Sequence, residues 1–144
     1  MTPLANVFTL DASVFINAFN TREPGHETSR AVLDRFRRDS TPMIEPTLLL
    51  PETAAAIRRG TEDPKLARRF AEQLGRAAGL YWVELDEKLA AQASGIAADH
   101  ALRASDAVYA SVALRFGAAL VTLDKQQLER VPSVVEALSP EQLI

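Results

Sequence analysis

The chain has 144 residues, no cysteine, two histidines and a formal net charge of −3 at pH 7, and a chain of this length predicts one domain, residues 1–144. The lack of cysteine excludes disulfides, thiolate zinc sites and cysteine nucleophiles, and two histidines are too few for a multi-histidine metal site or a histidine-based triad. The negative net charge means that the protein as a whole does not attract polyanions. No apolar run approaches the ~20 residues of a membrane span and no signal peptide is recognised, so we expect no membrane partner and a cytoplasmic location.

Apolar stretches typical of buried strands alternate along the chain with stretches of helical periodicity. The predicted strands are Val7–Leu10, Pro42–Glu45, Leu80–Leu85, Ala119–Leu123 and Val134–Leu138. The predicted helices are Ala12–Phe19, Glu27–Arg38, a helix capped by Thr47 and running to about Arg59, one opened by Asp63 and Pro64, one from Asp86 to about Ala98, Ser105–Phe116 and Lys125–Arg130. We expect the last six residues, SPEQLI, to be loosely held. The alternation predicts an α/β three-layer sandwich around a mostly parallel sheet of roughly five strands.

Four acidic residues stand beside apolar sequence at the expected ends of strands or starts of helices: Asp11, Glu52, Asp106 and Asp124. In a parallel sheet covered by helices, strand ends and helix starts meet at one edge, so we expect these side chains to lie close together. Taken singly, the three aspartates also fit the simpler role of helix caps. Glu52 is harder to explain in that way, because it lies inside its helix and is followed by small residues.

Four carboxylates at one edge would repel one another unless a cation neutralised them. Oxygen ligands without histidine or cysteine favour Mg²⁺ or Mn²⁺ over zinc. Such a site commonly serves phosphoryl chemistry, because the metal polarises a phosphate oxygen and lowers the pKa of a bound water. The spacing of the acids therefore favours a divalent metal site that acts on phosphate esters.

The segments LDASVFINAF, LLLPETAAAIRR and LRASDAVYASVALRFGAALVTLD follow the order and separations of PIN-domain ribonucleases, and the chain most closely resembles the VapC toxins of prokaryotic type II toxin–antitoxin modules. The resemblance runs from about Val7 to Leu138. It implies an endoribonuclease that cleaves RNA with metal-activated water and depends on Mg²⁺ or Mn²⁺. It also implies a cognate VapB-like antitoxin and a homodimer. The residues that it places in the metal site are Asp11, Glu52, Asp106 and Asp124, with Thr122 supporting them by hydrogen bonding.

The roles of Asn17, Arg59 and Arg103 stay open at this point. Asn17 fits either a supporting role near the site or a surface position. The arginines fit either contacts to the RNA backbone or solvated helix faces. Some relatives carry a further acid after the last one, where this chain has Lys125 and Gln126, so both one and two metal ions remain possible. The RNA target, the antitoxin and the dimer interface are likewise open.

Two other classes of protein and an inactive relative are the alternatives. A receiver-type phospho-signalling domain requires two adjacent acids after the first strand, and here only Asp11 is present. A haloacid-dehalogenase-type phosphatase requires an aspartate two residues after Asp11, where the chain has Ser13. A catalytically inactive PIN scaffold that binds RNA or protein is the third alternative, although all four acids are present.

Overall fold

In the computed structural model, which describes residues 6–144, five parallel strands form one sheet in the order β3-β2-β1-β4-β5. The strands are β1 (Phe8–Leu10), β2 (Met43–Pro46), β3 (Leu80–Val83), β4 (Ala119–Val121) and β5 (Ala137–Leu138). Thr9 is aligned with Leu120, which places β1 and β4 side by side at the centre of the sheet. The predicted α/β sandwich with a parallel sheet is confirmed.

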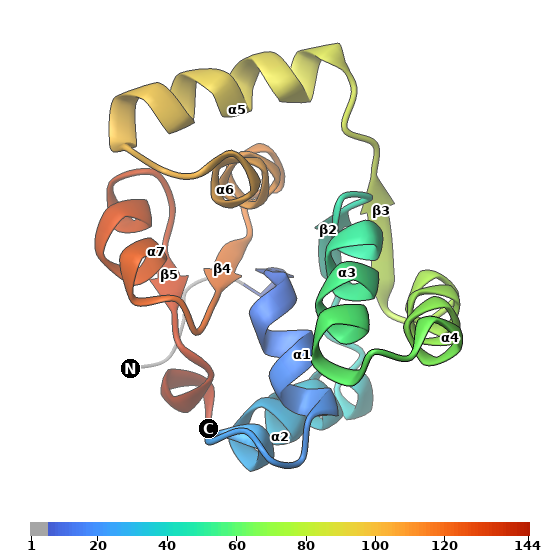
Figure 1. Cartoon of the computed structure of the whole chain (residues 1–144). Helices are drawn as coiled ribbons and strands as arrows, with labels where there is room; N and C mark the ends of the chain where they lie inside the picture. Colours follow the sequence, from blue (N-terminus) through green and yellow to red (C-terminus); the bar gives the residue numbers. More distant parts are fainter. Residues whose placement is uncertain (1–5) are drawn as a thin grey trace.

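Helices cover both faces of the sheet, as Figure 1 shows. They are α1 (Ala12–Phe19), α2 (His26–Arg38), α3 (Leu49–Thr61), α4 (Pro64–Gly75), α5 (Glu87–His100), α6 (Ala104–Phe116) and α7 (Lys125–Arg130), with the 3₁₀ turns η1 (Val131–Ser133) and η2 (Pro140–Leu143). Helix α6 packs on the central strands with α5 over it, and α1 and α2 lie on the opposite face. Helices α3 and α4 form a hairpin that contacts α1.

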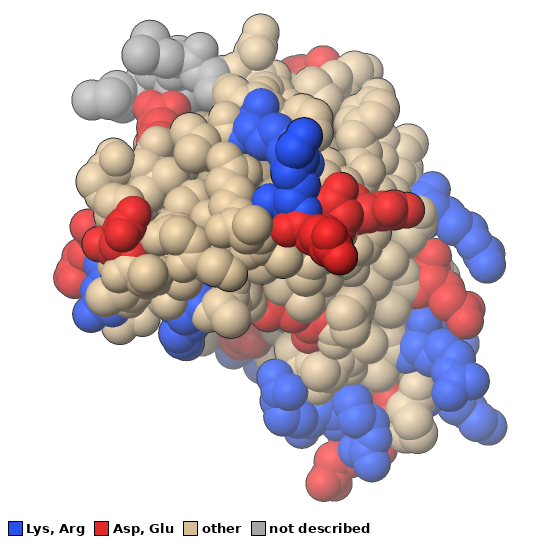
Figure 2. Space-filling view, turned by 90° about the horizontal axis from the view of Figure 1, so that it is seen from above, with Lys and Arg blue, Asp and Glu red and all other residues tan. Residues whose placement is uncertain are grey.

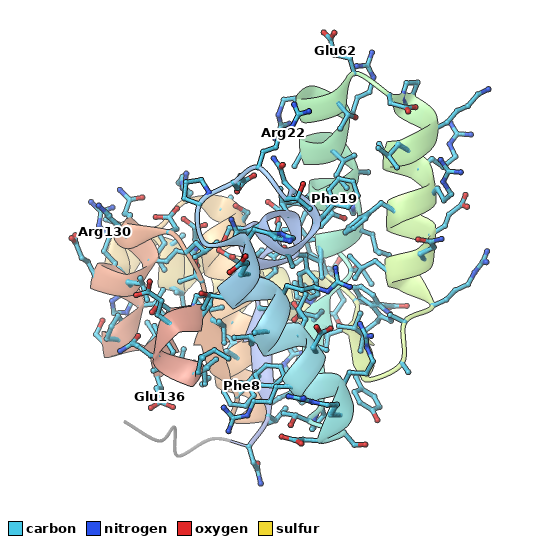
Figure 3. The ribbon with its side chains drawn as sticks, turned by 90° about the horizontal axis from the view of Figure 1, so that it is seen from below. Phe8, Phe19, Arg22, Glu62, Arg130 and Glu136 are labelled. Atoms are coloured by element: carbon cyan, nitrogen blue, oxygen red, sulfur yellow. The ribbon has the colours of Figure 1, made fainter. Side chains whose placement is uncertain are left out.

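Aromatic and small apolar residues hold these layers together. Residues 106–113 of α6 are all buried against the sheet and α5, because their side chains are mostly small and apolar. Phe8 of β1 stacks on Phe36 of α2 with ring centroids 4.7 Å apart, and Phe19 of α1 meets Phe70 of α4 edge to face at 5.0 Å. Figure 3 shows Phe8 and Phe19 on the side of the sheet that α1 and α2 cover. Aromatic pairs in such geometries add to the energy of burial, so they fix α2 and α4 against the core.

Local sequence signals set several helix ends as expected. Asp63 accepts hydrogen bonds from the backbone N–H groups of Lys65 and Leu66 at 3.1 Å, and Pro64 takes the first position of α4. Gly117 ends α6 with a φ of +65°, a left-handed conformation that costs glycine little. Within residues 6–144, no helix is both long and apolar enough to cross a membrane.

Two expectations about chain ends and caps are wrong. Thr47 does not cap α3: its backbone N–H bonds to the carbonyl of Val83, which prolongs the β2–β3 ladder, and the helix begins at Leu49 without a side-chain cap. The tail SPEQLI is not loosely held, since Leu143 is buried and Ser139 and Gln142 form a capping box. Arg35 of α2 also donates to the Leu143 carbonyl, so the tail is fixed by contacts distant in sequence.

Candidate functional site

The topology brings the four predicted acids to the carboxyl edge of the sheet. Asp11 directly follows β1, and Asp124 comes three residues after the end of the neighbouring strand β4. Glu52 lies in the first turn of α3, which follows β2. Asp106 lies in the first turn of α6, and because α6 leads into β4, its start is at the same edge.

Asp11 is buried at the end of β1 and is surrounded by hydrogen-bond donors. Its carboxylate accepts from the backbone N–H of Ser13 at 3.1 Å, from the Ser13 and Thr122 hydroxyls, the latter at 2.7 Å, and from the side-chain amide of Gln127. Burial raises the pKa of Asp11, while these hydrogen bonds oppose the rise and nearby Asp106 adds to it. The donors come from α1, α7 and the residue after β4, so Asp11 joins the three segments that surround it.

Asp106 and Asp124 are linked through a single guanidinium. Arg103, the residue before α6, donates from Nε to Asp106 Oδ2 at 2.9 Å and from Nη2 to Asp124 Oδ2. Burial raises the pKa of Asp106, and Arg103 opposes that rise. Asp124 caps α7, because its Oδ1 accepts from the backbone N–H of Gln126 at 2.8 Å. Asp11 and Asp124 therefore act as helix caps, as one reading of the sequence predicts, whereas Asp106 stands inside the first turn of α6.

Glu52 is held by a residue of another helix. Tyr109, which is 1% exposed, donates its hydroxyl to Glu52 Oε1 at 2.5 Å across the interface of α6 and α3. Burial raises the pKa of Tyr109 above its ordinary value, and the charge of Glu52 adds to the rise. The tyrosine hydroxyl is therefore a permanent donor at neutral pH, and it sets the orientation of the half-buried Glu52 carboxylate.

A fifth carboxyl group lies beneath the edge of the sheet. Glu45 of β2 is fully buried, and its Oε2 accepts from the backbone N–H of Leu10 at 2.7 Å, while its Oε1 has no partner among the described residues. Burial raises the pKa of Glu45 well above its ordinary value, and Asp11 adds to the rise. Glu45 takes the backbone donor at the end of β1, one residue before Asp11, and so fixes that strand end.

A cleft of about 460 Å³ opens beside these acids, between α1, α3 and the loop after β4. Its lining includes Glu52, the small side chains of Ala55 and Ala56, and Arg59 two turns further along α3. Ser13, which donates to Asp11, lies on the opposite wall. The cleft thus places one of the four predicted acids, Glu52, in the same hollow as the Arg59 guanidinium and a further carboxylate, Glu23.

Basic side chains gather on one side of the molecule, toward the α3–α4 hairpin (Figure 2). The hairpin carries five of them: Arg58, Arg59, Lys65, Arg68 and Arg69. Of these, Arg59 lines the cleft with Glu52, whereas Lys65, Arg68 and Arg69 line a separate hollow on α4.

The four acids at this edge differ in how directly they are connected to one another. Asp106 and Asp124 share Arg103, and Asp11 lies close enough to raise the pKa of both Glu45 and Tyr109 through its charge. In the arrangement of residues 6–144, no three His, Cys, Asp or Glu side chains are close enough to hold a metal ion. The donor set still has the chemistry of a Mg²⁺ or Mn²⁺ site, since all its ligand atoms are carboxylate oxygens and a cationic group already stands between two of them.

Some functional residues were visible in the sequence and others were not. Asn17 forms no hydrogen bond to any of the four acids within residues 6–144: it donates to Glu23 at 3.1 Å and accepts from Ser29 at 2.7 Å, and so ties α1 to α2. Tyr109 shares a helix face with Asp106 at a spacing of three residues, a signal that could have identified it. Gln127 gives no such signal, because nothing local distinguishes it from a surface glutamine.

Comparisons with known proteins agree with this geometry. The family model of the PIN domain matches residues 8–134. VapBC from Salmonella typhimurium has a chain of the same fold, with a TM-score of 0.69 at 19% identity over 94% of this chain and 99% of that one. VapC20 from Mycobacterium tuberculosis is described as a sarcin-ricin loop cleaving toxin. It has a TM-score of 0.71 at 17% sequence identity, over 85% of this chain and 93% of that one.

FitAcB from Neisseria gonorrhoeae gives a TM-score of 0.68 at 18% identity over 94% of this chain and 99% of that one. No curated protein matches the chain by sequence. The strand order 3-2-1-4-5 also differs from the order 2-1-3-4-5 of receiver domains, which makes the receiver alternative wrong. The match over residues 8–134, on a parallel sheet with acids at its carboxyl edge, shows that the chain belongs to the PIN domain family.

Proposed function

We propose that the chain is a divalent-metal-dependent endoribonuclease and the toxin of a VapBC-type toxin–antitoxin module. The proposal is supported by a PIN domain whose topology places Asp11, Glu52, Asp106 and Asp124 along the carboxyl edge of one parallel sheet, the edge at which Arg103 bridges Asp106 and Asp124. These acids are separated by more than a hundred residues, and helix capping explains only two of them.

The four carboxylates are the proposed ligands of one or two Mg²⁺ or Mn²⁺ ions. A bound ion of this kind neutralises charge on a phosphodiester and acidifies a water molecule. Thr122 supports the site, because its hydroxyl donates to Asp11 and accepts from the backbone N–H of Asp124 at 3.0 Å. Tyr109 holds Glu52, and Gln127 holds Asp11, so that two of the proposed ligands are oriented before any ion arrives.

The RNA strand lies in the cleft between α1 and α3 in this proposal. Ala55 and Ala56 leave room for a backbone beside Glu52, and Arg59 is placed to bind a phosphate next to the one that reacts. The arrangement would let a guanidinium hold the strand while the acids act at its reacting phosphate. The description of the structural neighbour VapC20 as a sarcin-ricin loop cleaving toxin supports RNA as the class of substrate.

The partners follow from the neighbours. VapBC from Salmonella typhimurium contains a chain of the same fold, which supports a VapB-like antitoxin as the partner of this chain. A homodimer is part of the same proposal.

The test is cleavage of total RNA by the purified protein with Mg²⁺ or Mn²⁺ and with EDTA. We expect cleavage with either metal, none with EDTA, and none for Asp106→Asn at an unchanged thermal unfolding midpoint. Asp99→Asn is the matched control, because Asp99 is an exposed acid on α5, and this variant should cleave like the wild type.

Cleavage that persists in EDTA, or that survives in Asp106→Asn, would contradict the metal mechanism. RNA binding with no cleavage under any of these conditions would instead favour the inactive scaffold.

A further inference from the structure

Arg103 occupies a position that the proposed function leaves unexplained. It is the residue before α6, its side chain is 62% exposed, and it makes no side-chain cap to its helix. Its guanidinium bridges two carboxylates that are 18 residues apart in sequence, Asp106 and Asp124. One guanidinium thus pairs with two carboxylates that would otherwise repel each other.

The oxygens of Asp124 show what this bridge blocks. Oδ1 is committed to α7, because it accepts from the backbone N–H groups of Gln126 at 2.8 Å and Gln127 at 3.4 Å. The remaining oxygen, Oδ2, accepts from Arg103. A cation that is to bind Asp124 without unwinding the start of α7 therefore needs the oxygen that Arg103 holds.

At Asp106, Arg103 holds one oxygen: Oδ2 accepts from Arg103 Nε at 2.9 Å. The two sides of the bridge differ in mobility, because the Asp106 side chain is 5% exposed whereas that of Arg103 is 62% exposed. Within residues 6–144, the Arg103 side chain forms hydrogen bonds only to these two carboxylates. The guanidinium can therefore move into solvent without disturbing the core, whereas the carboxylates cannot move away from it.

We propose that Arg103 is an internal counter-ion, which neutralises Asp106 and Asp124 in the metal-free protein and must leave them when a divalent ion binds. The inference rests on the proposed metal site and adds a residue that sets its affinity. Arg103 lowers the metal affinity because the ion needs Asp124 Oδ2, which the guanidinium holds together with Asp106 Oδ2, and it stabilises the metal-free fold because it offsets the repulsion between the acids.

The test is binding of Mn²⁺ alone, measured by isothermal titration calorimetry, together with thermal unfolding in EDTA. Arg103→Gln should bind Mn²⁺ about 3- to 5-fold more tightly, as expected for removal of an ion pair with one exposed partner. It should also unfold at a lower temperature than the wild type in EDTA, and saturating Mn²⁺ should raise its midpoint by more.

Lys125→Gln is the matched control, because Lys125 is an exposed cation directly after Asp124 that forms no ion pair within residues 6–144. Removing it takes away the same charge near the site without freeing an oxygen. An equal gain of affinity in Lys125→Gln and Arg103→Gln would mean that only long-range charge matters and would overturn the inference. So would an affinity of Arg103→Gln that is unchanged or weaker.

Arg103→Lys covers the case in which Arg103→Gln does not fold. Lysine keeps the charge but lacks the planar fork that spans two carboxylates, so its Mn²⁺ affinity should lie between those of the wild type and Arg103→Gln. An affinity equal to that of the wild type would contradict the bridging role. Absence of Mn²⁺ binding in every protein, including the wild type, would refute the proposed metal site itself, a result distinct from failure of the counter-ion alone.

Discussion

Replacing Tyr109 by Phe removes one hydroxyl from the interface of α6 and α3 and leaves the packing of the ring intact. The hydroxyl donates to Glu52 Oε1 at 2.5 Å, and the raised pKa of Tyr109 keeps its proton in place at neutral pH. Among residues 6–144, the only hydrogen bond that the variant loses is therefore the one that orients Glu52.

A hydrogen bond to a charged group contributes about 1.5–3 kcal/mol to stability. Glu52 is half-buried and lines an open cleft, so water can reach the oxygen that Tyr109 leaves, and we expect a loss near the lower end. A loss of about 1–2 kcal/mol corresponds to a fall of about 3–6 °C in the midpoint of thermal unfolding for a chain of this size. Freed from its partner, Glu52 must be ordered again on metal binding, at a cost of about 0.5–1.5 kcal/mol, which predicts a 2- to 10-fold weaker affinity for Mn²⁺.

The assay compares thermal unfolding in EDTA with calorimetric titration of Mn²⁺ for Tyr109→Phe and Tyr81→Phe. Tyr81 lies on the edge strand β3 with its side chain 59% exposed, so Tyr81→Phe should change neither quantity. A Tyr109→Phe protein with the wild-type midpoint would show that the hydrogen bond contributes nothing. A lower midpoint with unchanged Mn²⁺ affinity would show that Tyr109 is structural only and does not position Glu52 for a metal.

The remaining predictions concern the cleft and the buried acids. Arg59→Gln should raise KM for RNA with little change in kcat, and should reduce the salt dependence of RNA binding. Arg69→Gln, on α4 outside the cleft, should change neither quantity. Equal effects of the two variants would show that Arg59 has no special role in RNA binding at the cleft. The pKa of Glu45 is raised in the folded state, so the protonated Glu45 stabilises the fold fully below its unfolded pKa of about 4.3, and this stabilisation is lost as the pH rises toward the folded pKa. Urea unfolding of the wild type should therefore show a free energy of unfolding that falls as the pH rises from about 4 to 8. The fall should be smaller for Glu45→Gln. Asp11→Asn should abolish RNA cleavage while circular dichroism shows a retained fold, and cleavage at the wild-type rate would remove Asp11 from the mechanism.

The fold was predictable because local signals and tertiary packing agree in most of the chain. The apolar stretches that become β1 and β4 are followed by acids, and Asp63 with Pro64 marks the start of α4 by capping alone. The exceptions depend on long-range contacts: Thr47 joins the sheet through Val83, and the C-terminal turn is held by Arg35. No local pattern contains these partners.

The candidate site was predictable as a set of acids but not as a network. Asp11 and Asp124 were recognisable because a carboxylate directly after a buried strand is costly unless it is paired. The hydrogen-bond partners lie far away in sequence, Tyr109 from Glu52 and Gln127 from Asp11. The spacing of Tyr109 from Asp106 places it on the same helix face, but no spacing indicates Gln127. Glu45 carries the same signal as Asp11, an acid at the end of a buried strand, and only the structure shows that it faces inward.

The most direct test of the proposed metal site is a crystal structure with Mn²⁺, in which anomalous scattering locates the ion. We expect an anomalous peak among Asp11, Glu52, Asp106 and Asp124, with the Arg103 guanidinium turned away from Asp124. A peak at another place on the protein, or no peak at saturating Mn²⁺ with Arg103 still bound to both carboxylates, would show that these four acids do not form a metal site.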